Sequence, residues 1–400
     1  MPPTAASRAN DAMVDRLIGL GALWSPGLIA AFRDTPRHCF LHRVYQYQRR
    51  AGRWREVATR DPGPDELRLL YSDRALITRL APASRTEAPV PISSSSQPSL
   101  MAQMLEDLGA RPGDRVLEVG TGTGYNAALL AHVAGPGRVW SIDVDRQVLS
   151  EAWDHLNAFA GRHVELRHAD GRCGYAEAAP FDRIMVTAAT PDLEPAWLEQ
   201  LAPGGVLLAP LALAPGLAFV ACGTVIDGAF EGRLTRAAFF MPLRAEGEAM
   251  AAVPEAPPSG PFARVPAPWA AWFERRRPRP GWLGFAQSLA FYALLRGLRV
   301  SYQALADGET TFGVAEPDGT ACWLGEDRWH VAGQAGRALG EGLWQAFLAA
   351  GGPWPTEFRL RASPRSELTS GGGREVYERQ GPRCRQVWEL IEPRERPAWL

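Results

Sequence analysis

One short stretch constrains the fold of this chain more than any other. A run over residues 115–119, apolar except for Arg115 and Glu118, ends at three closely spaced glycines, Gly120, Gly122 and Gly124. The run predicts a buried strand, and the glycines predict a tight turn at which a helix begins. Glycine suits such a turn because it adopts positive φ and lets a ligand approach the bare backbone. Glycine turns also close ordinary strand–helix joints, so this loop needs support from elsewhere in the chain.

Two further strand-like runs give that support. Residues 139–144 contain Asp143, about twenty residues after the glycine loop, and residues 164–171 end in Asp170-Gly171. An acid at this distance from a glycine loop suits the ribose hydroxyls of a nucleotide-like cofactor. Asp170 could accept a hydrogen bond from an adenine amino group, while an Asp-Gly turn without a ligand is the alternative.

Glu118, just before the glycine loop, indicates which cofactor to expect. A dinucleotide site would show Gly-x-Gly-x-x-Gly, with the third glycine one position later. An acid at the loop disfavours a pyrophosphate and favours a cation, such as the sulfonium and ammonium groups of S-adenosyl-L-methionine. The alternative is that Glu118 only caps the turn. We expect S-adenosyl-L-methionine as the cofactor and no metal, because no histidines or cysteines show metal-ligand spacing.

Composition excludes several classes of protein. The formal net charge of -1 argues against a general nucleic-acid binder, and all 43 basic residues are arginine. The five cysteines include no Cys-x-x-Cys pair, which favours a reducing compartment. The sequence has neither a signal-peptide pattern nor about eighteen consecutive apolar residues. We therefore expect a cytoplasmic protein that binds neither membrane nor nucleic acid.

The order of the predicted elements favours an α/β fold. Residues 8–33 have helical spacing, broken at Trp24-Ser-Pro26, where Ser25 could cap a second helix. Residues 50–68 show no core pattern and predict a loop. Strands and helices then alternate, which predicts a doubly wound sheet. The expected strands are residues 115–119, 139–143, 164–167, 182–187, 205–209 and 217–224.

Shifts in composition divide the chain into regions. A Pro/Ala/Glu-rich segment loses all periodicity and predicts a linker. An α+β module follows, with helices expected over 283–295 and 336–348 and no motif that carries chemistry. The expected regions are an N-terminal helical and loop region (1–90), a cofactor-binding domain (91–244), the linker (245–268) and the C-terminal module (269–400).

A run of four serines, Ser93-Ser-Ser-Ser-Gln-Pro98, precedes a helix that is expected to reach Leu108. A solvated linker is the usual reading of such composition. Hydroxyls and N–H groups at the start of a helix could instead orient a carboxylate. If the cofactor is present, the candidate substrate-binding residues are Ser94, Ser95, Ser96 and Gln97.

Several motifs together resemble the protein-L-isoaspartate O-methyltransferase family, over roughly residues 10–225. They are Pro36-Arg-His-Cys-Phe40, Tyr71-Ser-Asp73, Ser96-Gln-Pro98, the glycine loop, Asp170-Gly-Arg-Cys-Gly-Tyr175 and Leu201-Ala-Pro-Gly-Gly205. The resemblance implies a class I methyltransferase fold, Rossmann-like and doubly wound, with S-adenosyl-L-methionine over the glycine loop. The residues that it implies for the cofactor, from the methionine end to the adenine, are Glu118, Gly120, Thr121, Gly122, Asp143, Val144, Asp170 and Gly171.

The resemblance also implies a catalytic role for Ser96, on which the substrate serine of the family falls. Ser94 and Ser95 replace the usual Thr-Ile pair, and the C-terminal module is an addition. Both departures resemble relatives that methylate an aspartate in ribosomally made peptides, where the ester collapses to an aspartimide. A carboxylate with a pKa of about 4 is already ionised at neutral pH, so the enzyme must align it and needs no general base.

Three functions follow as hypotheses. The leading one is a methyltransferase that esterifies an aspartyl side chain in a modified, cyclised precursor peptide, which the C-terminal module would recognise. The second is an isoaspartyl repair methyltransferase with an accessory domain. The third is a non-catalytic scaffold that binds S-adenosyl-L-methionine.

Overall fold

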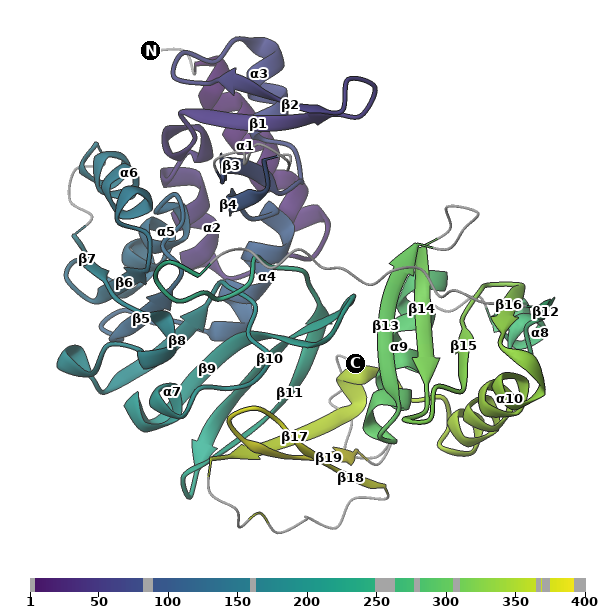
Figure 1. The fold of residues 1–400 in the computed structure, drawn as a ribbon. Helices are drawn as coiled ribbons and strands as arrows, with labels where there is room; N and C mark the ends of the chain where they lie inside the picture. Colours follow the sequence, from purple (N-terminus) through teal and green to yellow (C-terminus); the bar gives the residue numbers. More distant parts are fainter. Residues whose placement is uncertain are drawn as a thin grey trace.

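A ten-stranded sheet forms the centre of the computed structural model, which describes residues 4–81, 89–158, 163–248, 263–276, 281–304, 310–364, 368 and 375–391 (Figure 1). Its strands, in spatial order, are β18 (Val376–Gln380), β19 (Arg385–Leu390), β17 (Phe358–Ser363), β11 (Ala229–Ala237), β10 (Leu217–Ile226), β9 (Leu201–Ala214), β8 (Phe181–Val186), β5 (Val116–Val119), β6 (Val139–Asp143) and β7 (Val164–His168). The pairs from β9 to β7 are parallel. All six expected strands are confirmed, while β11 was not expected.

Helices cover both faces of the parallel part of the sheet. On one face lie α4 (Pro98–Leu108), α5 (Tyr125–Ala134) and α6 (Arg146–Asn157), and on the other lies α7 (Pro195–Gln200). Successive residues of a strand serve the two faces in turn. Val116 packs into the core beneath α4 and α5, and Leu117 packs into the core that contains α7. This double burial explains why the strands read as continuous apolar runs.

The N-terminal region stands at the top of Figure 1. It contains α1 (Ala5–Gly19), α2 (Pro26–Asp34), α3 (Pro64–Leu70), a short 3-10 helix (Arg37–Phe40) and an antiparallel sheet in the order β2 (Arg53–Ala58), β1 (Arg43–Gln48), β3 (Leu76–Leu80), β4 (Pro91–Ser95). The predicted loop over 50–68 is wrong, because it holds β2 and the start of α3. Strand β2 lies at the edge of its sheet and has no buried residue, so no apolar alternation reveals it.

Ser25 precedes α2, as expected, but it makes no capping hydrogen bond. Its hydroxyl instead contacts the carboxylate of Glu106. The same carboxylate accepts hydrogen bonds from the N–H groups of Trp24 and Ser25, each at 2.7 Å. The bend between α1 and α2 is therefore held from α4, a contact that local sequence does not reveal.

The C-terminal region builds a second sheet with its own helices. The strands are β12 (Ala263–Pro266), β16 (Arg328–Val331), β15 (Ala321–Trp323), β14 (Thr310–Ala315) and β13 (Arg299–Ala304), and the helices are α8 (Ala270–Arg276), α9 (Trp282–Leu295) and α10 (Gly333–Ala349). The helices expected over 283–295 and 336–348 are confirmed as α9 and α10. Helix α9 contacts β13 and β14 as well as β10 and β18, so it packs between the two sheets and is apolar on every side.

The last strands of the chain return to the large sheet. β17 pairs antiparallel with β11, with Phe230 opposite Ala362, and β19 and β18 continue the same sheet. The expectation of a separate module over 269–400 is therefore wrong for residues 358–390, which extend the sheet of the cofactor-binding part. Of the expected linker, residues 249–262 lie outside the described residues, and residues 263–266 form β12.

Candidate functional site

The carboxyl ends of the parallel strands open into a cavity of about 970 Å³, where ligands of doubly wound sheets bind. Its wall includes the glycine loop, the end of β4 and residues 236–244. Asp170 is the only sequence-predicted site residue that does not line it. Those that do are Ser94, Ser95, Ser96, Gln97, Glu118, Gly120, Thr121, Gly122, Asp143, Val144 and Gly171.

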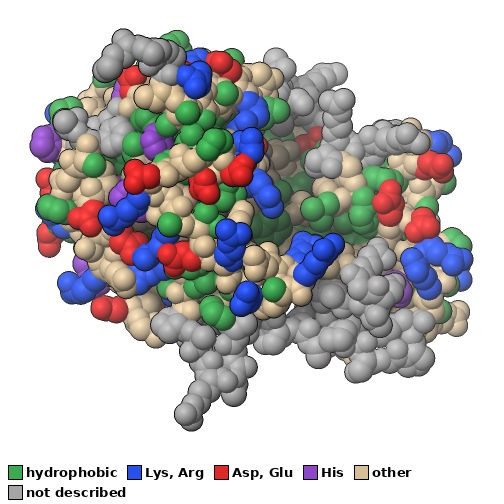
Figure 2. Space-filling view, turned by 90° about the horizontal axis from the view of Figure 1, so that it is seen from above, with side chains coloured by type: hydrophobic (Ala, Val, Ile, Leu, Met, Phe, Trp, Pro, Cys, Tyr) green, Lys and Arg blue, Asp and Glu red, His purple; other side chains and the backbone are tan. Residues whose placement is uncertain are grey.

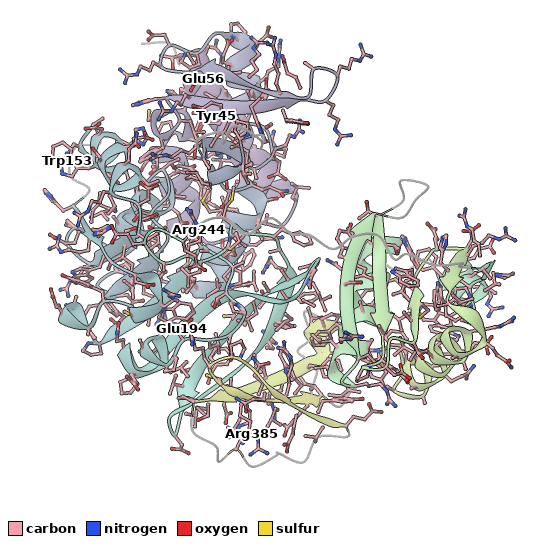
Figure 3. The ribbon with its side chains drawn as sticks, viewed as in Figure 1. Tyr45, Glu56, Trp153, Glu194, Arg244 and Arg385 are labelled. Carbon is pink, nitrogen blue, oxygen red and sulfur yellow. The ribbon has the colours of Figure 1, made fainter. Side chains whose placement is uncertain are left out.

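The outer wall of the cavity is mainly apolar. Val90 and Phe239 belong to it and are 42% and 61% exposed. Figure 2 shows hydrophobic side chains gathered in a hollow near the centre of one face, with arginines along its edge. Arg244 also lines the cavity, and Figure 3 places it over the upper ends of the parallel strands. This wall suits a ligand larger than the cofactor alone, such as an extended peptide.

The glycine loop has the geometry that the sequence predicts. Gly120, Gly122 and Gly124 have φ values of 100°, 53° and 80°. A Cβ atom on Gly120 would lie 2.5 Å from the hydroxyl oxygen of Thr187, so the loop passes too close to this side chain for any other residue. Thr187 also donates a 2.7 Å hydrogen bond to the carbonyl of Gly120. Thr187 lines the cavity directly after β8, and no sequence motif indicated this residue.

Glu118 differs from its expected role because its side chain has no exposed surface. Its carboxylate accepts hydrogen bonds from Asn126 at 2.7 Å and from Ser141 at 2.5 Å. Burial raises the pKa of Glu118 to about 7. The carboxylate neither caps the turn nor lies exposed to a ligand, so it can act on a cation in the cavity only through space.

Asp143 is held at the end of β6, in the wall of the cavity. Its carboxylate accepts the N–H of Gly122 at 3.3 Å and the N–H of Asp145 at 3.0 Å. Burial raises the pKa of Asp143, and the positive charge of Arg244 opposes this rise. The bare backbone of Gly122 beside a carboxylate fits a nucleoside with ribose hydroxyls.

The turn after β7 separates the two residues expected at the adenine. Asp170 forms an ion pair with Arg172 at 2.6 Å, and this hydrogen-bonded partner lowers the pKa of Asp170. Gly171 lines the cavity, and a Cβ atom on it would lie 2.5 Å from the Cγ1 atom of Val119. An adenine contact by Asp170 therefore stays a prediction, while Gly171 lies where a flat ring could approach.

The serine run forms a strand and not a solvated linker. Ser95 is buried, and its hydroxyl accepts a 3.2 Å hydrogen bond from Arg37. Alternation along β4 puts Ser94 on the opposite face. The carbonyl oxygen of Ser94 is 3.7 Å from where a Cβ atom of Gly122 would lie, so β4 runs beside the glycine loop. Ser96 follows in the cavity wall, and its hydroxyl has no hydrogen-bond partner among the described residues.

Arg37 and Asp73 hold the serine run in place, and neither was predicted from the sequence as a site residue. Arg37 is fully buried and donates to the carbonyl of Ser96 at 2.8 Å. Asp73 accepts hydrogen bonds from the N–H of Ser99 at 2.8 Å and from the side-chain amide of Gln97 at 3.1 Å. The side chain of Gln97 is thus already engaged. The available signal was that both residues lie in motifs of the family resemblance.

Within the described part of the chain, no group of three or more histidine, cysteine, aspartate or glutamate side chains could hold a metal ion. The helices of the described residues are all too short or too polar to span a bilayer.

A family model and several curated relatives match this chain. The family model described as "Protein-L-isoaspartate(D-aspartate) O-methyltransferase (PCMT)" matches residues 75–247. A protein-L-isoaspartate O-methyltransferase from Anaeromyxobacter dehalogenans is 43% identical over 151 residues, which cover 37% of this chain and 71% of the relative. One from Methanopyrus kandleri is 34% identical over 206 residues, which cover 51% of this chain and 77% of the relative.

A solved structure has a similar fold. It is named protein-L-isoaspartate O-methyltransferase, is 23% identical in sequence, gives a TM-score of 0.50, and matches over 88% of this chain and 96% of its own. The expected class I methyltransferase fold is thereby confirmed. Because the match covers 88% of this chain, it extends into the C-terminal region.

Proposed function

This chain belongs to the protein-L-isoaspartate O-methyltransferase family, and we propose that it methylates the free carboxylate of an isoaspartyl residue in a protein or peptide. It is a carboxyl O-methyltransferase that uses S-adenosyl-L-methionine, as the sequence predicts. A cytoplasmic location, as expected from the sequence, is part of the proposal.

One observation carries the proposal: β4 brings Ser96 to the same cavity as Gly122 and Asp143. Bound S-adenosyl-L-methionine supplies a methyl group on a positively charged sulfur, which an ionised carboxylate accepts without a general base. Gly120 and Gly122 would let the cofactor lie against bare backbone, and Asp143 would hold its ribose. Ser96 would orient the substrate carboxylate through its hydroxyl, so the protein contributes alignment.

The peptide-tailoring hypothesis is the second candidate. The observation that favours it is the serine run, in which Ser94 and Ser95 replace the usual Thr-Ile pair. The C-terminal region does not favour it, since the fold of a solved protein-L-isoaspartate O-methyltransferase matches 88% of this chain. An isoaspartyl substrate is therefore the better supported of the two.

Two peptides distinguish the candidates. One is a linear peptide with a single isoaspartate, paired with a control of the same sequence that has ordinary aspartate. The other is a cyclised peptide that carries ordinary aspartate. With S-adenosyl-L-methionine present, we expect the isoaspartyl peptide alone to gain 14 mass units, about one methylene group, and to yield S-adenosyl-L-homocysteine. Methylation of the cyclised peptide alone would support tailoring, and absence of S-adenosyl-L-homocysteine with every peptide would support a non-catalytic scaffold.

A further inference from the structure

Asp192 lies outside the cavity and is a fully buried carboxylate. One of its oxygens accepts the N–H groups of Arg383 at 2.8 Å and Cys384 at 2.7 Å. The other accepts the side-chain amide of Gln386 at 2.8 Å and the N–H of Leu193 at 2.8 Å. A buried charge is tolerated only when it is hydrogen-bonded in this way. Two of the four donors come from the turn between β18 and β19 and a third, Gln386, from the start of β19, almost two hundred positions later in the chain.

The segment that contains Asp192 begins in the cavity wall. Thr187 and Ala188 line the cavity, and Thr187 donates to the carbonyl of Gly120. Ala189 exchanges two backbone hydrogen bonds with the segment after β11, to Met241 at 2.8 Å and from Leu243 at 2.7 Å. Both of these partners line the cavity too. Residues 187–189 therefore link the glycine loop to a second part of the wall.

The two ends of this segment are joined through Thr190. The N–H of Thr190 donates to the carbonyl of Pro210 at 3.0 Å, and its hydroxyl donates to the carbonyl of Asp192 at 2.7 Å. Glu194 adds a contact at the far end, an ion pair of 3.2 Å with Arg383. A displacement of Asp192 would consequently be transmitted over few bonds to Thr187 and Gly120.

We propose that Asp192 is a positioning residue, through which residues 381–386, the turn after β18 and the start of β19, fix the segment 187–190 and the glycine loop. If residues 381–386 withdrew their donors, the buried carboxylate would lose three of its four hydrogen bonds and would move toward solvent. The C-terminal strands would then support the cofactor site from outside the cavity. The effect on the cofactor rests on the proposed function, whereas the effect on the segment does not.

Gly381 offers a test that leaves the cavity residues unchanged. A Cβ atom on Gly381 would lie 2.2 Å from a carboxylate oxygen of Asp192 and 2.8 Å from its Cγ atom. Gly381 is not among the glycines with positive φ, so alanine suits its backbone and conflicts mainly with Asp192. The matched control is Gly342→Ala in α10, where a Cβ atom would have no neighbour within 4 Å. Asp192→Asn is a second variant, which keeps the volume and turns an amide group toward N–H donors.

Two measurements on the full chain decide the proposal. We expect Gly381→Ala and Asp192→Asn to speed hydrogen exchange of the amides in residues 187–194 without any ligand. We also expect them to weaken the binding of S-adenosyl-L-homocysteine about tenfold in calorimetry, and Gly342→Ala to change neither. If both variants fold and keep the hydrogen-exchange rates and the S-adenosyl-L-homocysteine affinity of the parent, the proposal is overturned. A lower melting temperature alone would not rescue it. If the parent bound no S-adenosyl-L-homocysteine, the proposed function would fail, and the exchange data would still decide the role of Asp192.

Discussion

The guanidinium of Arg37 donates a 2.8 Å hydrogen bond to the carbonyl oxygen of Ser96. Arg37 also donates to the carbonyl of Leu70 at 2.8 Å and to the hydroxyl of Ser95 at 3.2 Å. Within the described chain it forms no ion pair with an acid. Burial lowers the pKa of Arg37 to about 10, so it stays charged at neutral pH. A buried cation held by carbonyl groups thus joins the N-terminal region to the loop that should bind the substrate.

Arg37→Lys is expected to raise the KM for the peptide more than the KM for S-adenosyl-L-methionine. Lysine keeps the charge but has three donors in place of five. Some of the carbonyl groups that Arg37 now holds, such as those of Leu70 and Ser96, would therefore be left without a donor. A stability loss of about 1–3 kcal/mol should accompany the change, since buried acceptors lose their donors. Steady-state kinetics and urea unfolding measure the two effects.

The matched control for Arg37 is Arg33→Lys. Arg33 pairs with Asp11 and Asp15 on the surface, where ion pairs contribute little. The Arg33→Lys variant should leave the KM values for the peptide and for S-adenosyl-L-methionine unchanged. An unaltered peptide KM in Arg37→Lys would show that Arg37 does not position the serine run.

Local signals explain how much of the site the sequence could predict. Gly120 and Gly122 follow an apolar run directly, and Asp143 ends the next strand, so spacing alone places all three in one cavity. Asp192 carries no such signal, because its partners lie in the turn near Cys384. The pairing of β11 with β17 is hidden for the same reason: register between distant strands leaves no trace in either segment.

Side-chain partners were also beyond prediction, even within a correctly placed motif. The motif offers Asp170 as an acceptor for an adenine amino group, but Arg172, two positions later, pairs with it. Glu118 lies beside the loop as expected, yet Ser141 and Asn126 enclose its carboxylate. The direction of a side chain depends on neighbours from other elements, which spacing within one motif does not specify.

Glu118→Gln should stabilise the fold, and more so at higher pH. Because burial raises the pKa of Glu118 to about 7 from an ordinary 4.5, the folded protein keeps a proton that the unfolded chain releases. Stability therefore falls as pH rises from 4.5 to 7 and stays lower above it. Glutamine removes this loss of about 3 kcal/mol. Melting temperatures measured at pH 4.5 and pH 8, about the two limits of this titration, check this. The variant should melt at a higher temperature than the parent, and the difference should be larger at the higher pH.

The charge of Glu118 should also set the preference for a cationic ligand. Its ionised form attracts the sulfonium of S-adenosyl-L-methionine, which S-adenosyl-L-homocysteine lacks. The ratio of the two dissociation constants should shift toward S-adenosyl-L-methionine as pH rises through about 7, where the pKa of Glu118 lies. Calorimetry across this range should give a sloping ratio for the parent and a flat one for Glu118→Gln. A slope that persists in the variant would assign the effect to another group.

Gly171→Ala should weaken cofactor binding about tenfold, because the turn that contains Gly171 would move and the cofactor would no longer be aligned against the cavity wall. The added Cβ atom would meet Val119 at 2.5 Å and Leu243 at 2.9 Å, so the turn must move in the cavity wall. Gly27→Ala in α2 is the control, since its Cβ atom would have no neighbour within 4 Å. Calorimetry with S-adenosyl-L-homocysteine measures both variants, and equal affinities would place the ligand away from Gly171.

His42 and His155 form a pair behind the glycine loop, with ring nitrogens 3.2 Å apart. His155 also donates to the carbonyl of Thr123 at 2.9 Å. Burial lowers the pKa of both histidines. Repulsion from His155 lowers the pKa of His42 further, whereas the hydrogen bond to Thr123 and the charge of Glu151 oppose the lowered pKa of His155. The folded state thus resists protonation that the unfolded chain accepts below about 6.5.

Stability should consequently fall as pH drops from about 6.5 through the lowered pKa values of the pair. Two protonated rings at this distance would repel, and the shift of His155 would pull on Thr123 in the glycine loop. His42→Gln removes one charge and should flatten the acid limb of the melting temperature between about pH 5 and pH 6.5. His330→Gln in β16 serves as the control and should keep the parental profile. If both variants lost stability in acid as steeply as the parent, carboxylates elsewhere would have to account for it.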